Sequence, residues 1–287
     1  MGQSTAVPKD RSNAPEQVTG SSRNGVAVFV DGWNLHRGCE RAFQHGPVHM
    51  MFLARQLAGD RPLLAVRYFI GVPDARAEAD NARRRTRQLE LMAATGVDVH
   101  PKKLRYRHEW KFNKWDLPDP RKHEGETRQT SVTSRRQGRE KGVDVELALS
   151  AFQTAITGEA STIIIVSADT DLNLVPQQLD PLRKTGLRVR VENAAINNAG
   201  RKYLNHAYDW THQIDKKLFA AVRDDFDYQN PVPRGARRRY LNAVEAGEQT
   251  VPPGGWLSKP HPSARRNSVN KKSDRDRSKG SSRTRRR

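Results

Sequence analysis

An α/β fold with an open, mainly parallel sheet is predicted by two features of the sequence. Short apolar runs rich in β-branched residues alternate with longer segments of helix-forming residues. The run Val26–Val30 is apolar at every position and the run Ser161–Val166 at its last four, which is typical of strands buried on both faces of a parallel sheet. Strands that alternate with helices form such a sheet with helices covering both faces.

The elements follow in chain order. The expected strands are Val26–Val30, Leu63–Ile70, Val97–Val99, Ser161–Val166 and Leu187–Val191. The expected helices are Ala75–Thr95, Val143–Thr157 and Leu172–Lys184, and Tyr203–Phe219 is expected to be of mixed structure. Few helix breakers interrupt the first of these helices, and Gly96 follows its end.

The positive charge is concentrated in two parts of the chain. The 287 residues include 51 Lys and Arg against 32 Asp and Glu, a net charge of +19. Residues 101–141 contribute +7 and residues 231–287 contribute +12, so the remaining chain is nearly neutral. We therefore predict an α/β domain over residues 25–220 that carries a basic insert at about 101–141.

Both ends of the chain are expected to be disordered. Residues 1–24 form a short arm rich in Ser and Gly, and residues 221–287 form a basic tail that is rich in Pro, Gly, Ser and Arg from Pro231 onward. Such compositions bury too little apolar surface to offset the entropy of ordering. The basic tail would attract phosphates without sequence preference, or it would serve only as a solubilising tail.

Several classes of protein are excluded. No apolar run approaches the roughly 20 residues that a bilayer requires, and Cys39 is the only cysteine, so neither an intramolecular disulfide nor a multi-cysteine zinc site is possible. No apolar signal core is found near the N-terminus, so we expect a cytoplasmic chain. A P-loop pattern is absent, and Trp33 stands where a haloacid dehalogenase-type phosphatase requires its second Asp.

Four aspartates are expected at one edge of the sheet. Asp31 ends the first strand, Asp169 and Asp171 follow the Ser161–Val166 strand, and Asp144 begins a helix. Ligands of open parallel sheets bind outside the carboxyl ends of the strands. Crowded carboxylates repel one another unless a cation intervenes, and Mg²⁺ or Mn²⁺ prefers oxygen ligands. The alternative for each aspartate is a purely structural role as a turn residue or a helix cap.

The motifs that carry these aspartates resemble the NYN domain, a branch of the PIN-like nuclease superfamily. The matching segments, in order, are Val28–Leu35, Lys141–Val145 and Ser167–Leu172, within about residues 25–215. Departures from the usual family pattern occur at Ala168, Thr170 and Leu172. A further departure is Ser150, because many relatives carry an acidic residue near this position.

The resemblance implies a PIN-like fold and metal-dependent ribonuclease activity. It implies that Asp31, Asp144, Asp169 and Asp171 hold Mg²⁺ or Mn²⁺. Asn34 would hold the site together or contact substrate, and its alternative is an Asx turn before the next helix. Some relatives are not demonstrated nucleases, so a non-catalytic RNA-binding or regulatory protein on the same fold is the alternative function.

The basic insert is predicted to bind nucleic acid. It interleaves aromatic and cationic residues, a composition suited to stacking unpaired bases and following a phosphate backbone. The candidate contacts are Arg105, Tyr106, Arg107, Trp110, Lys111, Phe112, Lys114, Trp115 and Lys141. Single-stranded RNA is the expected partner, and DNA is a second possibility. The aromatic residues would alternatively pack a hairpin onto the domain, and the stretch Glu124–Glu140 is expected to be mobile.

Overall fold

The computed structural model describes residues 24–112, 132–196 and 205–258. Six parallel strands form the central sheet, and they are β1 (Val26–Asp31), β2 (Leu63–Val72), β3 (Asp98–Lys103), β6 (Thr162–Val166), β7 (Arg190–Ile196) and β8 (Trp210–Ile214). Their order across the sheet is β3-β2-β1-β6-β7-β8. The predicted α/β fold with a parallel sheet is therefore confirmed.

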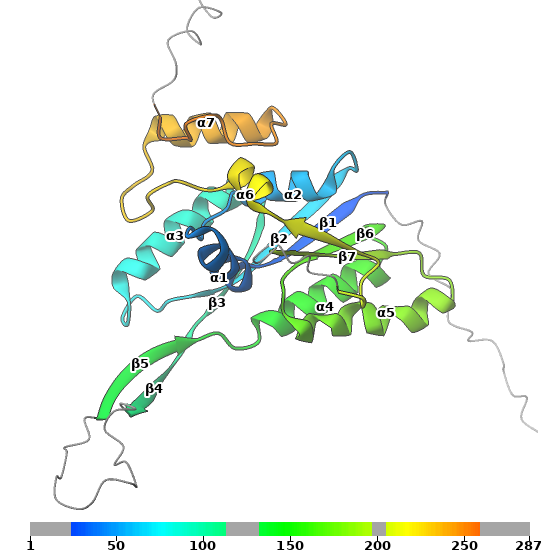
Figure 1. The fold of residues 1–287 in the computed structure, drawn as a ribbon, viewed down its shortest axis with the longest axis horizontal. Coiled ribbons are helices and arrows are strands. Elements are labelled where there is room, and N and C mark those ends of the chain that lie inside the picture. The colour runs from blue at the N-terminus through cyan, green and yellow to red at the C-terminus, as the bar shows by residue number, and fades with distance from the viewer. Residues whose placement is uncertain (1–23, 113–131, 197–204, 259–287) are drawn as a thin grey trace, which may run out of the picture.

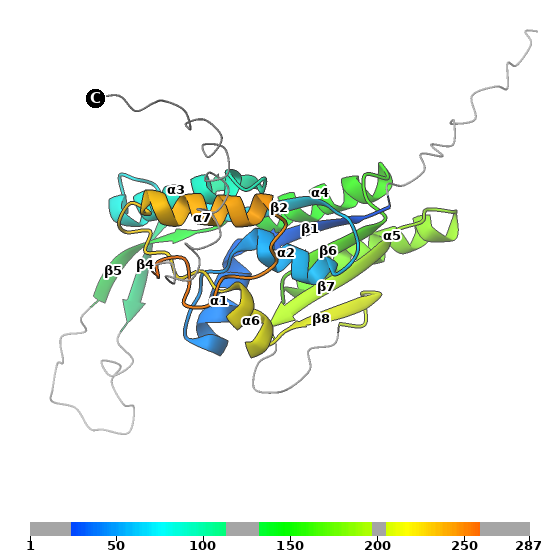
Figure 2. The same ribbon diagram turned by 90° about the horizontal axis from the view of Figure 1, so that it is seen from above.

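Helices cover both faces of this sheet (Figures 1 and 2). One face is covered by α4 (Val143–Ile156) and α5 (Leu174–Lys184). The other is covered by α1 (Gly32–Phe43), α2 (Met50–Ala58), α3 (Ala79–Ala93), α6 (Lys216–Val222) and α7 (Arg234–Glu245). Along β1, Val28 and Val30 face the second group of helices, whereas Ala27 and Phe29 face the first. This alternation makes β1 fully buried.

Several helices differ from the prediction. The structure has α1 and α2 between residues 32 and 60, where no element is predicted from the sequence. The predicted helix at Ala75 begins only at Ala79, because Asp74 accepts backbone hydrogen bonds from residues 76–78 and forms a turn. The predicted strand at Leu187 begins later, at Arg190.

The tail is only partly as expected. Disorder was expected from Pro231, but α7 and the segment that follows it are ordered as far as Ser258. Tyr240 and Trp256 are each 2 % exposed because they pack against Phe52 of α2. The expectation of disorder is thus wrong for residues 231–258, and residues 1–23 and 259–287 lie outside the described part of the chain.

The basic insert forms an antiparallel hairpin of β4 (Arg105–Phe112) and β5 (Val132–Arg139). The hairpin leaves the sheet after β3 and extends away from the body of the domain (Figure 1). The expectation of a mobile stretch Glu124–Glu140 is therefore wrong for its second half, while residues 124–131 lie outside the described residues. Within the described parts of the chain, no helix is long and apolar enough to cross a membrane.

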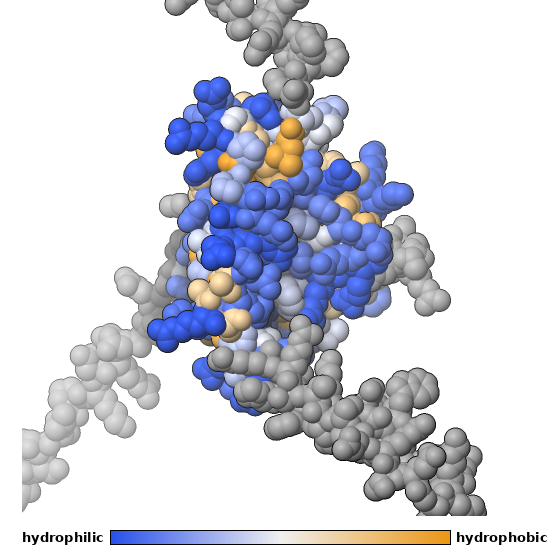
Figure 3. All heavy atoms as spheres, turned by 90° about the vertical axis from the view of Figure 1, so that its left-hand side faces the viewer, coloured by the Kyte–Doolittle hydropathy of each residue, from blue (hydrophilic) through white to orange (hydrophobic). Residues whose placement is uncertain are grey.

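The face that α3 contributes to is dominated by hydrophilic side chains (Figure 3). Arg83 and Arg84 are exposed there, as expected of a solvated face. Arg85 differs, because its side chain is buried and donates a hydrogen bond to Gln88 (2.7 Å). The guanidinium of Arg85 therefore contributes positive charge inside the domain rather than on its surface.

Candidate active site

The candidate site lies where the connectivity of the sheet reverses direction. From β1 the chain first builds β2 and β3 on one side, and later returns to add β6 and β7 on the other. A crevice forms at such a switch point, outside the carboxyl ends of the two central strands. Asp31 is the last residue of β1, and Asp169 follows the end of β6. The topology thus brings together two aspartates separated by 138 positions in the sequence.

Asp31 uses its two carboxylate oxygens differently. Oδ1 accepts the backbone N–H of Asn34 (3.0 Å) and caps α1, which is the structural role considered as the alternative for this residue. Oδ2 accepts the hydroxyl of Ser167 (3.1 Å), which belongs to the segment after β6. Because a carboxylate has about four lone-pair positions, both bonds leave capacity for a further ligand. Capping and participation in a site are therefore compatible at Asp31.

Ser167 joins the two halves of the site. While its hydroxyl donates to Asp31, its oxygen accepts the backbone N–H of Asp169 (3.1 Å). Asn193 of β7 fixes the same segment, because its side-chain amide donates to the carbonyl of Ser167 (2.8 Å). Neither Ser167 nor Asn193 was singled out from the sequence, although Ser167 opens one of the quoted motifs.

Asn34 connects the beginning of α1 to the segment after β6. Its side-chain oxygen accepts the backbone N–H of Ala168 (2.9 Å). The side chain thus bridges two distant segments and does not close a local Asx turn. This contact fits the role of holding the site together that the resemblance implies.

The surroundings of Asp31 disfavour the ionised form of its carboxyl group. Burial of the carboxyl, which belongs to a residue only 8 % exposed, raises the pKa of Asp31, and the nearby Asp169 carboxylate raises it further. The hydrogen bonds from Asn34 and Ser167 act in the opposite direction, but burial outweighs them. A bound cation would favour the ionised form of this carboxyl.

Asp171 and Asp144 complete the predicted set. Asp171 is exposed on the short 3₁₀ helix η2 (Thr170–Asn173), and its backbone N–H donates to Asp169 (3.0 Å). Asp144 is half-buried in the first turn of α4, a helix that packs against η2. All four aspartates lie in the described part of the chain, and no three of their carboxylates come within 4.8 Å of one another. None of the four forms an ion pair with a described Lys, Arg or His.

Glu140 is a further acidic residue at this edge. It lies between β5 and α4, and its carboxylate accepts the backbone N–H of Gly71, near the end of β2. Burial raises the pKa of Glu140, and the charge of Asp31 raises it further against the hydrogen bond from Gly71. Its position directly before the quoted Lys141–Val145 motif is the one signal that would have identified it from the sequence.

Basic and aromatic side chains border the acidic edge. The guanidinium of Arg37 lies 4.5 Å above the ring of Trp33, on the first turns of α1. Arg37 and the buried Arg85 both exert positive charge on Glu140. Lys141 is exposed directly after Glu140. A polyanion approaching this edge would therefore meet positive charge beside the carboxylates.

Among the candidate nucleic-acid contacts in the hairpin, three have side chains that the structure describes. Arg105 and Arg107 are exposed, whereas the hydroxyl of Tyr106 accepts the backbone N–H of Asp74 (3.1 Å) and donates to Glu78 (3.0 Å). Tyr106 therefore holds the base of the hairpin onto the connection between β2 and α3. Trp110, Lys111 and Phe112 lie in β4 with side chains outside the described part, and Lys114 and Trp115 lie outside the described residues altogether.

A small cavity of about 180 Å³ opens beside the site. Its lining combines polar groups with aliphatic side chains. Its walls include Asn34, Arg41, Ser167, Ala168, Ile196 and Ile214. A cavity with an apolar wall and a few polar groups is the usual form of a ligand subsite.

Comparison with known proteins places this arrangement in a family. The model of the NYN domain family matches residues 25–207, which include all three predicted motifs. The chain belongs to the NYN domain family. The NYN domain has a nuclease-type, PIN-like fold, so the predicted family and fold are both confirmed.

Other comparisons add little to this assignment. A solved structure of a Vibrio parahaemolyticus protein of unknown function aligns with 69 % of this chain and 96 % of its own, at 14 % identity and a TM-score of 0.42. No curated protein matches the chain. The assignment thus depends on the NYN domain match.

Proposed function

We propose that this NYN domain protein is a metal-dependent ribonuclease that hydrolyses phosphodiester bonds within single-stranded RNA. The observation that carries the proposal is the pair Asp31 and Asp169, joined through Ser167 at the switch point of the sheet. Neither carboxylate has a basic partner among the described residues. Uncompensated acidic groups at a ligand-binding edge are suited to a divalent cation.

The acidic residues fit Mg²⁺ or Mn²⁺. Hard cations take oxygen ligands, and Mg²⁺ keeps several waters while it uses only one or two carboxylates. The open spacing of the four aspartates suits such a hydrated ion better than a tight all-protein cage. Asp31 and Asp169 would hold it, with Asp144 and Asp171 supporting it directly or through water. When bound, the metal supplies a hydroxide near neutral pH and neutralises charge on the phosphate under attack.

The remaining residues of the site orient these groups and bind substrate. Ser167 and Asn34 fix the two aspartate-bearing segments relative to each other. Trp33 is partly exposed and offers an aromatic face for an unpaired base, while Arg37 and Lys141 are placed to contact phosphates. Arg105 and Arg107 would extend this contact along the hairpin.

Cleavage of a labelled single-stranded RNA tests the proposal. We expect cleavage by the purified full chain with Mn²⁺ or Mg²⁺ and none with EDTA. Asp169→Asn should reduce the rate by about 10³-fold, because metal stabilisation of charge at the reacting phosphate contributes several kcal/mol. Asp227→Asn, which alters an exposed carboxylate outside this edge, is the matched control and should leave the rate unchanged.

Two results would contradict the proposal. Cleavage that persists in Asp169→Asn would come from a contaminant, and RNA binding without cleavage under all metal conditions would favour a non-catalytic RNA-binding protein. A single-stranded DNA of the same sequence, tested in parallel, determines whether the 2′-hydroxyl contributes to recognition.

A further inference from the structure

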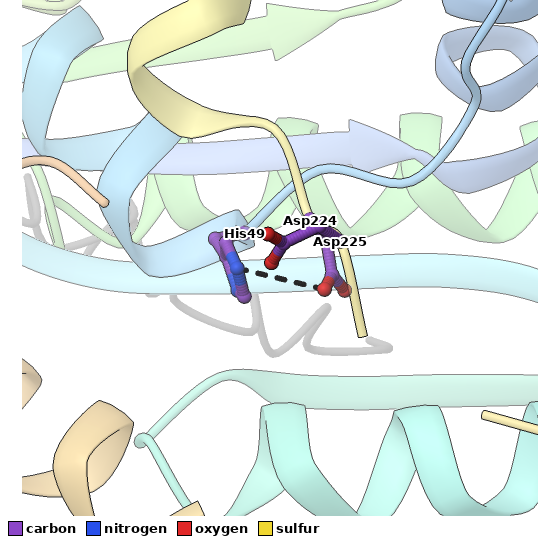
Figure 4. A group of neighbouring side chains, drawn as sticks. All are labelled: His49, Asp224 and Asp225. Carbon is purple, nitrogen blue, oxygen red and sulfur yellow. Dashed lines mark ion pairs between the residues drawn. The ribbon is translucent and has the colours of Figure 1, made fainter. Parts of the chain in front are cut away.

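A second cluster of potential metal ligands lies where the C-terminal elements join the domain. The NYN match ends at residue 207, and the chain continues through β8, α6 and α7. After α6 the chain passes beside the beginning of α2 (Figure 4). There His49 of the NYN domain faces Asp224 and Asp225 of the extension, and one ligand atom from each lies within 4.8 Å of the others.

His49 has the properties of an unused ligand. Its side chain is 2 % exposed, and its Nε2 atom has no hydrogen-bond partner. Aromatic rings of Phe52, Phe226, Tyr240 and Trp256 enclose it at centroid distances of 4.7–6.0 Å. In its neutral form, a histidine ring with an unpartnered nitrogen offers a lone pair to a metal ion.

Within the described parts of the chain, His49 is the one basic residue that forms an ion pair with these aspartates. Both oxygens of Asp224 accept hydrogen bonds, from the backbone N–H of Phe226 (3.0 Å) and the hydroxyl of Tyr228 (2.8 Å). Oδ1 of Asp225 is buried without any partner. Among the described residues, no Lys or Arg forms an ion pair with either carboxylate. Adjacent carboxylates, of which Asp224 is buried and Asp225 partly buried, are stabilised by a compensating cation.

The spacing of the ligand atoms matches a bound ion better than a hydrogen bond. Nε2 of His49 lies 3.5 Å from Oδ1 of Asp224, which exceeds the usual hydrogen-bond distance of about 2.7–3.2 Å. Two ligands that each lie about 2.1 Å from a tetrahedral zinc ion are separated by about 3.4 Å.

We propose that His49, Asp224 and Asp225 bind one Zn²⁺ ion that fastens the C-terminal extension to the NYN domain. A set of one imidazole and two carboxylates suits zinc, with a water as the fourth ligand. The buried Nε1–H of Trp256, which also has no acceptor, is a candidate donor to that water. The site shares no residue with the acidic edge, and its role is structural, because it joins segments 175 positions apart.

Zinc binding by the full chain tests this proposal. The purified protein is stripped with EDTA, dialysed and titrated with ZnCl₂, and its zinc content and melting temperature are measured. We expect one tightly bound zinc per chain and a rise in melting temperature on binding. Replacement of zinc by Co²⁺ should give the intense visible absorption of a tetrahedral site.

Matched variants distinguish this site from the acidic edge. His49→Phe, which keeps an aromatic ring among aromatic neighbours, and Asp225→Asn should each weaken zinc binding at least about tenfold. They should also abolish the zinc-dependent rise in melting temperature. Asp227→Asn in the same segment and Asp169→Asn at the acidic edge should bind zinc as the unmodified chain does.

The proposal is overturned if the stripped chain takes up no zinc at micromolar concentrations, or if both ligand variants retain it. Loss of zinc in Asp169→Asn alone would assign the ion to the acidic edge instead. Should His49→Phe fail to fold, Asp225→Asn and the Co²⁺ spectrum of the unmodified chain decide the question.

Discussion

Ser167 shows how one small side chain organises the candidate active site. Its hydroxyl donates to the carboxylate of Asp31 and accepts the backbone N–H of Asp169, so it sets the relative position of two acidic residues at the ends of neighbouring strands. The same hydrogen bond partly offsets the rise in the pKa of Asp31 that burial causes. Ser167 is therefore a positioning residue that acts through Asp31.

Ser167→Ala should raise the pKa of Asp31 further, because a hydrogen bond to the charged form is lost. Cation binding requires the ionised carboxylate. The Mn²⁺ concentration for half-maximal RNA cleavage should therefore rise about tenfold at pH 6.5, as for other residues that support metal ligands. The difference from the unmodified chain should shrink as the pH is raised to 8.5, because a higher pH favours the ionised form of Asp31 in both proteins.

Ser161→Ala is the matched control for this experiment. Ser161 precedes β6 as Ser167 follows it, and its hydroxyl also makes hydrogen bonds, to the backbone of Gly25 at the opposite end of the sheet. This variant should leave the Mn²⁺ dependence unchanged. An equal effect of both substitutions, or one independent of pH, would show that Ser167 has only a structural role.

Among the elements, α1 has the closest connection to the site. It begins at Gly32 directly after Asp31, and its first turns carry Trp33, Asn34 and Arg37. A Cβ atom added to Gly32 would lie 2.5 Å from the ring of Tyr68, a buried residue of β2. Glycine at this position allows the helix to approach the sheet closely enough for Asn34 to reach Ala168.

Gly32→Ala should destabilise the protein by about 1–3 kcal/mol, the usual effect of overpacking a core. It should also reduce RNA cleavage, because displacement of α1 moves Asn34 and Asp31 relative to β6. Chemical denaturation and the cleavage assay measure the two effects.

Gly235→Ala is the corresponding control in α7. Gly235 is exposed, and the nearest atom to an added Cβ is the flexible end of Arg239 at 3.6 Å. Alanine has the higher helix propensity, so this change should leave stability unchanged or raise it by up to about 1 kcal/mol. Similar stabilities for Gly32→Ala and the unmodified chain would argue against the close approach.

An element was predicted correctly where its buried residues form a recognisable apolar pattern in the sequence. The strands β1 and β6 consist of consecutive apolar residues, and they were predicted almost to the residue. Helix α1 buries Gly32, Leu35, Gly38 and Cys39, a face in which glycines replace the apolar side chains that would reveal a helix. In α7 the buried Ala236, Tyr240, Ala243 and Val244 have helical spacing, but they stand within an Arg-rich composition typical of disorder.

At the scale of the whole molecule, Glu192 ties together segments from three parts of the chain. Its side chain in β7 is 2 % exposed and accepts two hydrogen bonds from Arg61, which precedes β2, and one from His212 of β8. Burial alone would raise the pKa of Glu192, but these partners outweigh burial and lower it to about 2. The ionised form is thus stabilised only in the folded protein.

The free energy of unfolding should therefore fall as the pH decreases. The pKa of Glu192 is lower in the folded than in the unfolded state, so its contribution is complete above about pH 5 and is lost as the pH approaches 2. A shift from 4.5 to about 2 corresponds to about 3 kcal/mol. Urea denaturation between pH 7 and pH 2 measures this dependence.

Glu192→Gln should remove this part of the pH dependence and lower stability at pH 7, because Arg61 loses its buried partner. Glu245→Gln changes an exposed carboxyl of α7 and should follow the unmodified chain at every pH. If Glu192→Gln kept the full pH dependence, other carboxyl groups would be responsible.

The fold class, the family and the aspartate motifs are predictable from the amino-acid sequence, because burial on both faces and the motif spacings depend on local residue order. Only the tertiary structure could show that Ser167 links Asp31 to Asp169, that Glu140 reaches the end of β2, and that His49 faces Asp224 and Asp225. The residues brought together in these contacts are 69 to 175 positions apart in the sequence. Whether a buried side chain such as His49 lacks a hydrogen-bond partner also depends on distant residues. Such relationships are set by the packing of elements against one another, and periodicity along the chain does not encode them.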